Sequence, residues 1–186
     1  MKITKKKVLN ILPILVVLAF FVTPLGYYGK VLLNRIFASE PTIIQSTSRN
    51  RISGYDWKLR DESSDYLNFK KSQGKVVFIN FWATWQLPSV AQLYDIQELY
   101  DQYHDKVDFY LITDEERTPV VEFMEKNDYT FPVTYQIIGE KSPIALLKPS
   151  GSYILDKKGF IVVHQTAISD WDNTKVTTLL DSLLLE

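Results

Sequence analysis

Two positions in this sequence, Gln86 and Ser89, have the spacing of a thiol redox pair but carry no thiol. They follow the β-branched and aromatic run at residues 76–81, which is typical of a strand buried on both faces. Pro88 favours a helix start here, because a proline in the first helical turn loses no hydrogen bond. A helix N-terminus lowers the pKa of a cysteine, and two cysteines three residues apart there can exchange disulfides. An amide and a hydroxyl form no mixed disulfide, so we predict no thiol chemistry at these positions.

The surrounding sequence, Phe-Trp-Ala-Thr-Trp-Gln-Leu-Pro-Ser at residues 81–89, resembles the membrane-tethered, TlpA/ResA-like branch of the thioredoxin superfamily. Members of this thiol-disulfide oxidoreductase family have Trp-Cys-x-Pro-Cys at this point. The resemblance spans residues 55–186 and places Gln86 at the nucleophilic cysteine and Ser89 at the resolving cysteine. It also aligns Gln92 with an acidic residue and Tyr94 with a proline of the family. A neutral amide at position 92 suits a site that has no thiol to titrate.

The composition of the chain excludes several function classes. With 21 basic and 22 acidic residues, the formal net charge of −1 offers no electrostatic footprint for nucleic acid. The absence of cysteine excludes thiol nucleophiles, disulfides and cysteine zinc sites. The two histidines, His104 and His164, are 60 positions apart, and we expect neither a metal site nor a cofactor. For the same reason Ser89 has no expected base nearby, and we predict no catalytic residue in the chain.

The N-terminal segment predicts a membrane anchor. Four lysines within residues 2–7 precede an apolar run at residues 8–25, which as a helix would reach roughly 27 Å, close to the ~30 Å hydrocarbon thickness. A cleaved signal peptide looks similar, but residues 36–39 make a poor cleavage site. We therefore expect a single-pass anchor in the cytoplasmic membrane, with the N-terminus cytoplasmic and the rest extracytoplasmic, periplasmic in a double-membrane bacterium.

We divide the chain into a head, anchor and juxtamembrane segment at residues 1–38, a linker at 39–54 and a thioredoxin-like domain at 55–186. Tyr27 and Tyr28 follow the predicted span, where aromatic rings favour the headgroup level. One interpretation of the apolar residues at 31–37 is a stripe that lies along the membrane surface. The other is that they extend the anchor or contact a partner helix. The Ser-, Thr- and Asn-rich composition of residues 39–54 indicates the linker.

The expected fold is α/β: a central mixed sheet with helices on both faces, extended by an N-terminal β-hairpin. Strands are predicted at residues 55–60, 67–69, 76–81, 107–112 and 160–163, with a further strand within 149–156 before the turn at 157–159, and helices at about 89–103, 119–126 and 173–184. Residues 131–135 resemble the family's segment after its second helix. Tyr55 and Trp57 are expected to point into the core, the alternative being a carbohydrate-stacking pair. The acidic residues Asp114, Glu115 and Glu116 are expected in a solvated loop, the alternative being a cation site.

The family's cis-proline, which faces the active loop, aligns with Ser150, one residue after Pro149. Either Pro149 has moved with a one-residue insertion or the cis bond is gone, since cis peptide bonds are essentially confined to proline. We predict a surface that binds an extended peptide or a partner protein. It includes Pro149, Ser150 and the two tryptophans of the loop, which we expect to be exposed, together with their neighbours. The remaining residues of this predicted surface are Trp82, Trp85, Gln86, Leu87, Pro88 and Ser89.

Three interpretations of function remain open at this point. The first is a redox-inactive, membrane-anchored binding module that uses the loop at residues 82–89, because aromatic anchors make efficient contact residues. The second is an accessory subunit of a disulfide-reductase complex whose cysteines come from another chain. The third is a decayed relative whose former active loop only packs.

Overall fold

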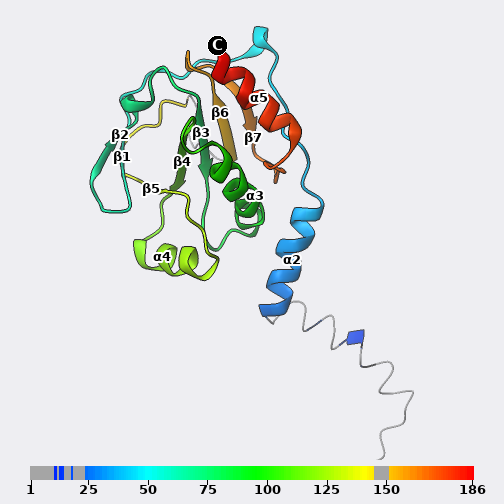
Figure 1. Cartoon of the computed structure of the whole chain (residues 1–186). Coiled ribbons are helices and arrows are strands. Elements are labelled where there is room, and N and C mark those ends of the chain that lie inside the picture. Colours follow the sequence, from blue (N-terminus) through cyan, green and yellow to red (C-terminus); the bar gives the residue numbers. More distant parts are fainter. Residues whose placement is uncertain (1–10, 12, 15–17, 19–23, 145–150) are drawn as a thin grey trace, which may run out of the picture.

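The computed structural model describes residues 11, 13, 14, 18, 24–144 and 151–186, which form a seven-stranded mixed sheet with helices packed against it (Figure 1). The strand order is β2-β1-β5-β4-β3-β6-β7. The strands are β1 (Lys58–Arg60), β2 (Tyr66–Asn68), β3 (Val77–Phe81), β4 (Asp108–Thr113), β5 (Val133–Gln136), β6 (Gly151–Leu155) and β7 (Ile161–Gln165). The helices are α2 (Pro24–Ile36), α3 (Leu87–Tyr103), α4 (Arg117–Lys126) and α5 (Thr174–Leu185), with short 3-10 helices η1 (Ser46–Ser48) and η2 (Phe69–Ser72).

The centre of the sheet follows from its connections. β3 runs parallel to β4, and β4 parallel to β5, because α3 and α4 provide the crossovers that parallel strands require. β6 lies antiparallel to β3, and a tight turn at residues 157–159 leads into the antiparallel β7. Gly159 has φ +81°, a conformation that L side chains rarely adopt, so glycine suits this turn. The expected mixed thioredoxin-like sheet is confirmed.

Successive side chains of β3 point to opposite faces of the sheet and belong to two separate core clusters. Phe78 packs on one face with residues of α3, α4 and α5, including Leu93, Val120 and Leu180. Val77 and Ile79 point to the opposite face. Each side of the strand is therefore buried, as the continuous apolar run predicts.

The second face corrects one expectation about the layers. Among the described residues, its core cluster takes no member from α2, α3, α4 or α5, so the expected α-helices on both faces are not found. Trp57 and Phe69, both fully buried, cover this face together with Ile144. Bulky aromatic residues from the segment before β3 thus take the place of a helical layer.

The predicted N-terminal hairpin is confirmed. β1 and β2 pair antiparallel, and β1 also pairs with β5, which attaches the hairpin to the main sheet. Trp57 points into the core as expected. Tyr55 is only half-buried and stacks on Phe69 with ring centroids 5.8 Å apart, so packing accounts for both aromatic residues.

The predicted membrane span at residues 8–25 lies largely outside the described residues. In the part of the chain that the structure describes, no helix combines the length and apolar character needed to cross a membrane. α2 begins where the apolar run ends and lies beside α3 (Figure 1).

The expected linker at residues 39–54 is attached to the domain along the outer edge of β7. The amide of Ile44 donates to the carbonyl of Val162 at 2.8 Å, and Ile43 forms an antiparallel bridge with Val163. Further bridges join Ser39 to Ser169 and Arg51 to Phe160. This segment satisfies part of the hydrogen-bonding capacity that an edge strand leaves open.

Candidate functional site

The loop after β3 places Gln86 and Ser89 against each other at the start of α3. Gln86 is the N-cap residue of α3 and Ser89 is the third residue of the helix. The hydroxyl of Ser89 donates a hydrogen bond of 2.9 Å to Oε1 of Gln86. The two side chains that the resemblance aligns with the family's cysteines are therefore in direct contact. They form a neutral polar pair, which offers no nucleophile of the thiol type.

Glu115, from the segment between β4 and α4, fixes the loop before this pair. Its carboxylate accepts hydrogen bonds from the amide of Thr84 at 2.6 Å and from the hydroxyl of Thr84 at 2.7 Å. Glu115 was expected in a solvated acidic loop, and the sequence did not indicate this role. No local pattern could have revealed it, because the two residues are 31 positions apart. These hydrogen bonds hold the loop at the end of the sheet. Trp85 and Gln86, which follow Thr84, are exposed.

The two tryptophans of the loop have different environments. Trp85 is 73% exposed, as expected of a contact residue. Trp82 is only 3% exposed and packs between Phe123 of α4 and Phe131, so the expectation that it is exposed is wrong. The cause is tertiary, because both packing partners come from segments about 40 or more residues later in the chain. Trp82 therefore supports the loop from beneath.

The other predicted binding residues are only partly brought together. Gln86 and Pro88 are exposed, Leu87 is half-buried and Ser89 is buried, so the outward surface consists of Trp85, Gln86 and Pro88. Pro149 and Ser150 lie outside the described residues, and their place opposite the loop stays a prediction.

Buried Gln92 connects α3 to the segment before α5. Its Oε1 accepts a hydrogen bond of 2.9 Å from the indole N–H of Trp171, and both residues are buried. An amide serves this bond without placing a charge in the core, which a carboxylate at the same position would do. The residue aligned with the family's acidic position thus has a structural partner here.

No imidazole base accompanies Ser89 among the described contacts. His104 follows the C-terminal end of α3, and His164 on β7 stacks on Tyr153 with ring centroids 4.3 Å apart. The hydroxyl of Ser89 already donates to Gln86. Acyl-transfer chemistry at Ser89 has no support in this geometry.

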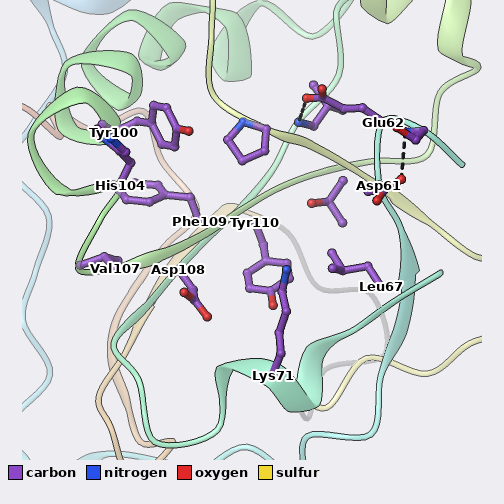
Figure 2. Close-up of a pocket in the computed structure, with 14 residues that line it drawn as sticks. Asp61, Glu62, Leu67, Lys71, Tyr100, His104, Val107, Asp108, Phe109 and Tyr110 are labelled. Carbon is purple, nitrogen blue, oxygen red and sulfur yellow. Dashed lines mark hydrogen bonds between the residues drawn. The ribbon is translucent and has the colours of Figure 1, made fainter. Parts of the chain in front are cut away.

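A cavity of about 360 Å³ lies between the β1–β2 hairpin, the end of α3 and the start of β4 (Figure 2). Its acidic groups are occupied in holding the fold. Asp61 accepts hydrogen bonds from the amides of Ser63 and Asp65, and Glu62 accepts one from the amide of Val133 at 2.7 Å. These contacts shape the hairpin and its attachment to β5, and they do not point to a ligand.

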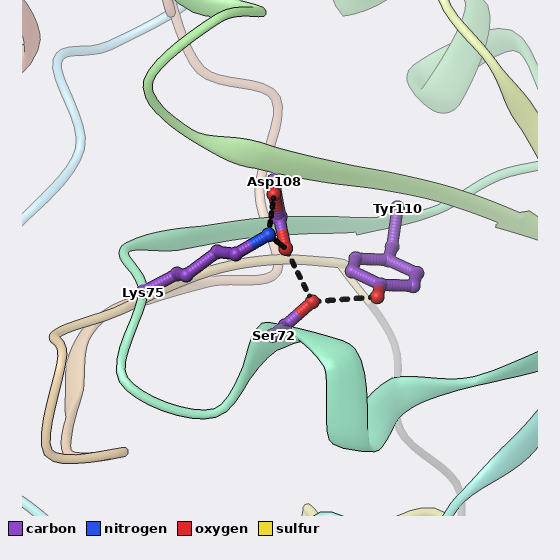
Figure 3. A network of polar contacts seen from close by, with 4 residues as sticks. All are labelled: Ser72, Lys75, Asp108 and Tyr110. Atoms are coloured by element: carbon purple, nitrogen blue, oxygen red, sulfur yellow. Dashed lines mark hydrogen bonds and ion pairs between the residues drawn. The ribbon is translucent and has the colours of Figure 1, made fainter.

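The polar network beside this cavity is also satisfied internally (Figure 3). Asp108 accepts hydrogen bonds from Lys75 at 3.0 Å and from the hydroxyl of Ser72 at 2.6 Å. Ser72 is also 2.6 Å from the hydroxyl of Tyr110, whose pKa burial raises to about 12. Tyr110 therefore stays a neutral phenol at physiological pH. This network joins the starts of β3 and β4, at the opposite end of these strands from the loop.

Asp95, three residues after Gln92 on α3, is a buried carboxyl that pairs with α2. Its Oδ1 lies 3.1 Å from the guanidinium of Arg35. Burial raises the pKa of Asp95 to about 6, Arg35 opposes this shift, and Asp170 and Asp172 add to it. Desolvation thus outweighs the ion pair.

We expect the Asp95→Asn variant to lose part of the pH dependence of stability. The pKa of Asp95 is above its unfolded value of 3.8, so its favourable contribution is complete below that pH and is lost as the pH rises through about 6. The wild type should therefore lose on the order of 2–3 kcal/mol relative to the variant between pH 4 and pH 7.

Denaturant unfolding of both proteins across this pH range measures the difference. Asp114→Asn, at an exposed position, is the control and should show no such pH-dependent difference. If the stability of Asp95→Asn relative to the wild type stays constant or falls as the pH rises from 4 to 7, the assignment is contradicted.

Comparison with known proteins points to one family. The AhpC/TSA family model matches residues 54–164. The thioredoxin-like protein YneN of Bacillus subtilis is 28% identical over 110 residues, covering 57% of this chain and 65% of its own. The thiol-disulfide oxidoreductase ResA of Bacillus cereus is 35% identical over 110 residues, covering 56% of this chain and 62% of its own. The chain thus matches somewhat less than two thirds of the length of these relatives.

Solved structures show the same fold. A DsbF homologue from Corynebacterium diphtheriae superposes with a TM-score of 0.61 at 17% identity, covering 78% of this chain and 94% of its own. A secreted thiol-disulfide isomerase from Corynebacterium glutamicum gives a TM-score of 0.62 at 15% identity, covering 81% of this chain and 95% of its own. At such identities the likeness concerns the fold alone.

Proposed function

Because this chain belongs to the AhpC/TSA family and contains no cysteine, we propose that it is a redox-inactive, thioredoxin-like binding protein. The observation that carries this proposal is the contact between Ser89 and Gln86, which occupies the place of a redox pair with two neutral polar groups. A thiolate is required for disulfide exchange, and no residue of the sequence can supply one. The relatives' names describe oxidoreductases, and their catalytic activity is not transferred to this chain.

The binding surface in this proposal is the outward part of the loop. Trp85 presents a large aromatic side chain with few rotatable bonds, which makes an efficient contact residue. The hydrogen bonds between Thr84 and Glu115 and the buried Trp82 hold its base in place, so little ordering is needed when a partner binds. The partner class is an extended peptide or a protein subunit.

The location in this proposal is the outer face of the cytoplasmic membrane. Its support is the sequence of residues 1–25, with a basic start and an apolar run long enough to span a bilayer. Most of this run lies outside the described residues.

Photocrosslinking in intact membranes tests the proposed binding surface. A photoreactive amino acid at position 86 is expected to capture one dominant protein, whereas the same group at exposed Lys106 is not. Cysteines in the captured chain would favour the alternative, an accessory subunit of a disulfide-reductase complex. Equal capture at both positions would contradict a binding role and favour a decayed loop.

The Trp85→Ala variant should weaken this capture. Truncating a central aromatic contact residue typically costs more than about 1.4 kcal/mol, which corresponds to at least a tenfold loss of affinity. Tyr66→Ala is the matched control, because Tyr66 is 75% exposed on the hairpin, far from the loop in the sheet order. Titration of the captured partner against both purified variants measures the effect. Equal affinities for the two variants would rule out Trp85 as an anchor.

A further inference from the structure

α2 is attached to the domain along one of its sides. Arg35 forms the ion pair with buried Asp95 and also lies over the ring of Tyr94, 3.9 Å from its centroid. Near the other end of the helix, the ring of Tyr28 lies 5.8 Å from the ammonium group of Lys126 on α4. Both ends of α2 therefore contact the domain.

The chain after α2 restrains it further. The amide of Asp170 donates to the carbonyl of Ser39 at 3.1 Å, and Ser39 forms a bridge with Ser169. Buried Pro41 follows, and then the residues that pair with β7. Only two residues separate the end of α2 from this attachment, so the helix cannot swing freely about its C-terminal end.

A neighbouring side of α2 is apolar and exposed. It consists of Leu32, Leu33 and Ile36 of α2 and of Phe37 directly after the helix, which together we call the free face. Pairs of these residues are four positions apart, and a helix places such residues on one side. Ile36 is 65% exposed and Phe37 is 80% exposed. α2 therefore combines contacts to the domain with an exposed apolar cluster on the same helix.

A lipid surface fits the free face better than a second copy of the chain. Four side chains expose on the order of 400 Å², about half of the ~800 Å² that each partner of a stable protein interface buries. An amphipathic helix, in contrast, inserts its apolar face about 5–10 Å into the boundary between headgroups and acyl chains. The apolar run that we assign to the membrane ends at residue 25, within the first turn of α2.

We propose that the free face of α2 lies in the membrane interface and, because α2 is docked on α3, holds the thioredoxin-like domain in one orientation on the bilayer. This inference rests on the proposed membrane anchoring and adds a second, shallower contact to it. The domain is thereby mounted on the lipid surface through a rigid helix, and the loop with Trp85 keeps a constant direction toward its partner.

The absence of cysteine makes depth measurement straightforward. Single cysteines at Phe37, at Leu18 inside the apolar run and at exposed Lys106 would each carry an environment-sensitive fluorophore, in the full chain reconstituted into phosphatidylcholine vesicles. Lipids brominated near the headgroup end of the acyl chain should quench the Phe37 label several-fold more strongly than the Lys106 label. Lipids brominated near the methyl end should quench the Leu18 label best.

The outcomes separate this inference from the anchoring on which it rests. Quenching at Leu18 without quenching at Phe37 would overturn the orientation by α2 and leave the anchor intact. No quenching at either position would overturn both. A Phe37 label that is shielded from aqueous iodide but insensitive to brominated lipid would show that protein covers the free face, which also overturns the inference.

Discussion

The double variant Gln86→Cys/Ser89→Cys is expected to form an intramolecular disulfide and to reduce insulin, whereas the wild type should show only the background rate. The two positions are three residues apart at the start of α3, which is the spacing at which two cysteines can exchange disulfides. Position 86 caps α3, where partial positive charge from the helix dipole stabilises a thiolate. We therefore expect the pKa of the new thiol at position 86 to fall below the ordinary cysteine value of about 8.5.

The measurements follow from this chemistry. Mass spectrometry after mild oxidation detects the disulfide, ultraviolet absorbance of the thiolate gives the pKa, and the insulin assay gives turnover. Each single variant is a control that can form a mixed disulfide but cannot resolve it intramolecularly. Thiol-dependent turnover by the pure wild type would contradict the proposed redox inactivity. A double variant that remains dithiol under oxidant would show that the loop has lost the geometry of the redox-active fold.

Replacing Trp171 by alanine is expected to cost the largest amount of stability of any change considered, about 3–5 kcal/mol. Trp171 is fully buried, and its ring meets Phe78 edge to face with centroids 5.0 Å apart. Its loss would open a large cavity between α3, α5 and the sheet. Typical domains are stable by only about 5–15 kcal/mol, so the variant should be close to unfolding at physiological temperature.

A milder pair of variants isolates the hydrogen bond between Trp171 and Gln92. Gln92→Leu leaves the indole N–H buried without its acceptor, which should cost about 1–3 kcal/mol. Trp171→Phe removes the donor, and the double variant closes a cycle whose coupling energy we expect to be about 1 kcal/mol. Denaturant unfolding followed by circular dichroism measures all four proteins. The control is Trp85→Ala at an exposed position, whose free energy of unfolding should stay within about 0.5 kcal/mol of that of the wild type. A coupling energy of zero would show that the hydrogen bond between Trp171 and Gln92 contributes nothing to stability.

Contact of α2 with the membrane would restrict the orientation of the domain, which the fold of the domain alone does not do. The Arg35–Asp95 pair joins α2 to a helix that begins at the loop with Trp85, so the proposed lipid contact and the proposed binding surface share α3. Protonation of Asp95, whose pKa is about 6, removes one charge of this pair. The pH dependence of stability and the fluorophore depth at Phe37 can therefore be measured on the same full-length chain.

Much of the fold could be predicted from local pattern. The continuous apolar run before the loop predicts β3 as a central strand, and Pro88 predicts the helix start, because both signals depend on only a few neighbouring residues. The hairpin between β6 and β7 follows in the same way from a short polar turn with Gly159 between two apolar segments. The boundaries moved by at most a few residues.

The loss of thiol chemistry is determined by the sequence by itself, since no tertiary arrangement can create a thiolate in a chain without cysteine. Only the tertiary structure decided which tryptophan of the loop is outward, because Phe123 and Phe131 cover Trp82 from distant segments. The same holds for the contacts of Thr84 with Glu115 and of Arg35 with Asp95. Local periodicity tells which side of an element is buried, but not which distant segment covers it, and these contacts depend on that pairing.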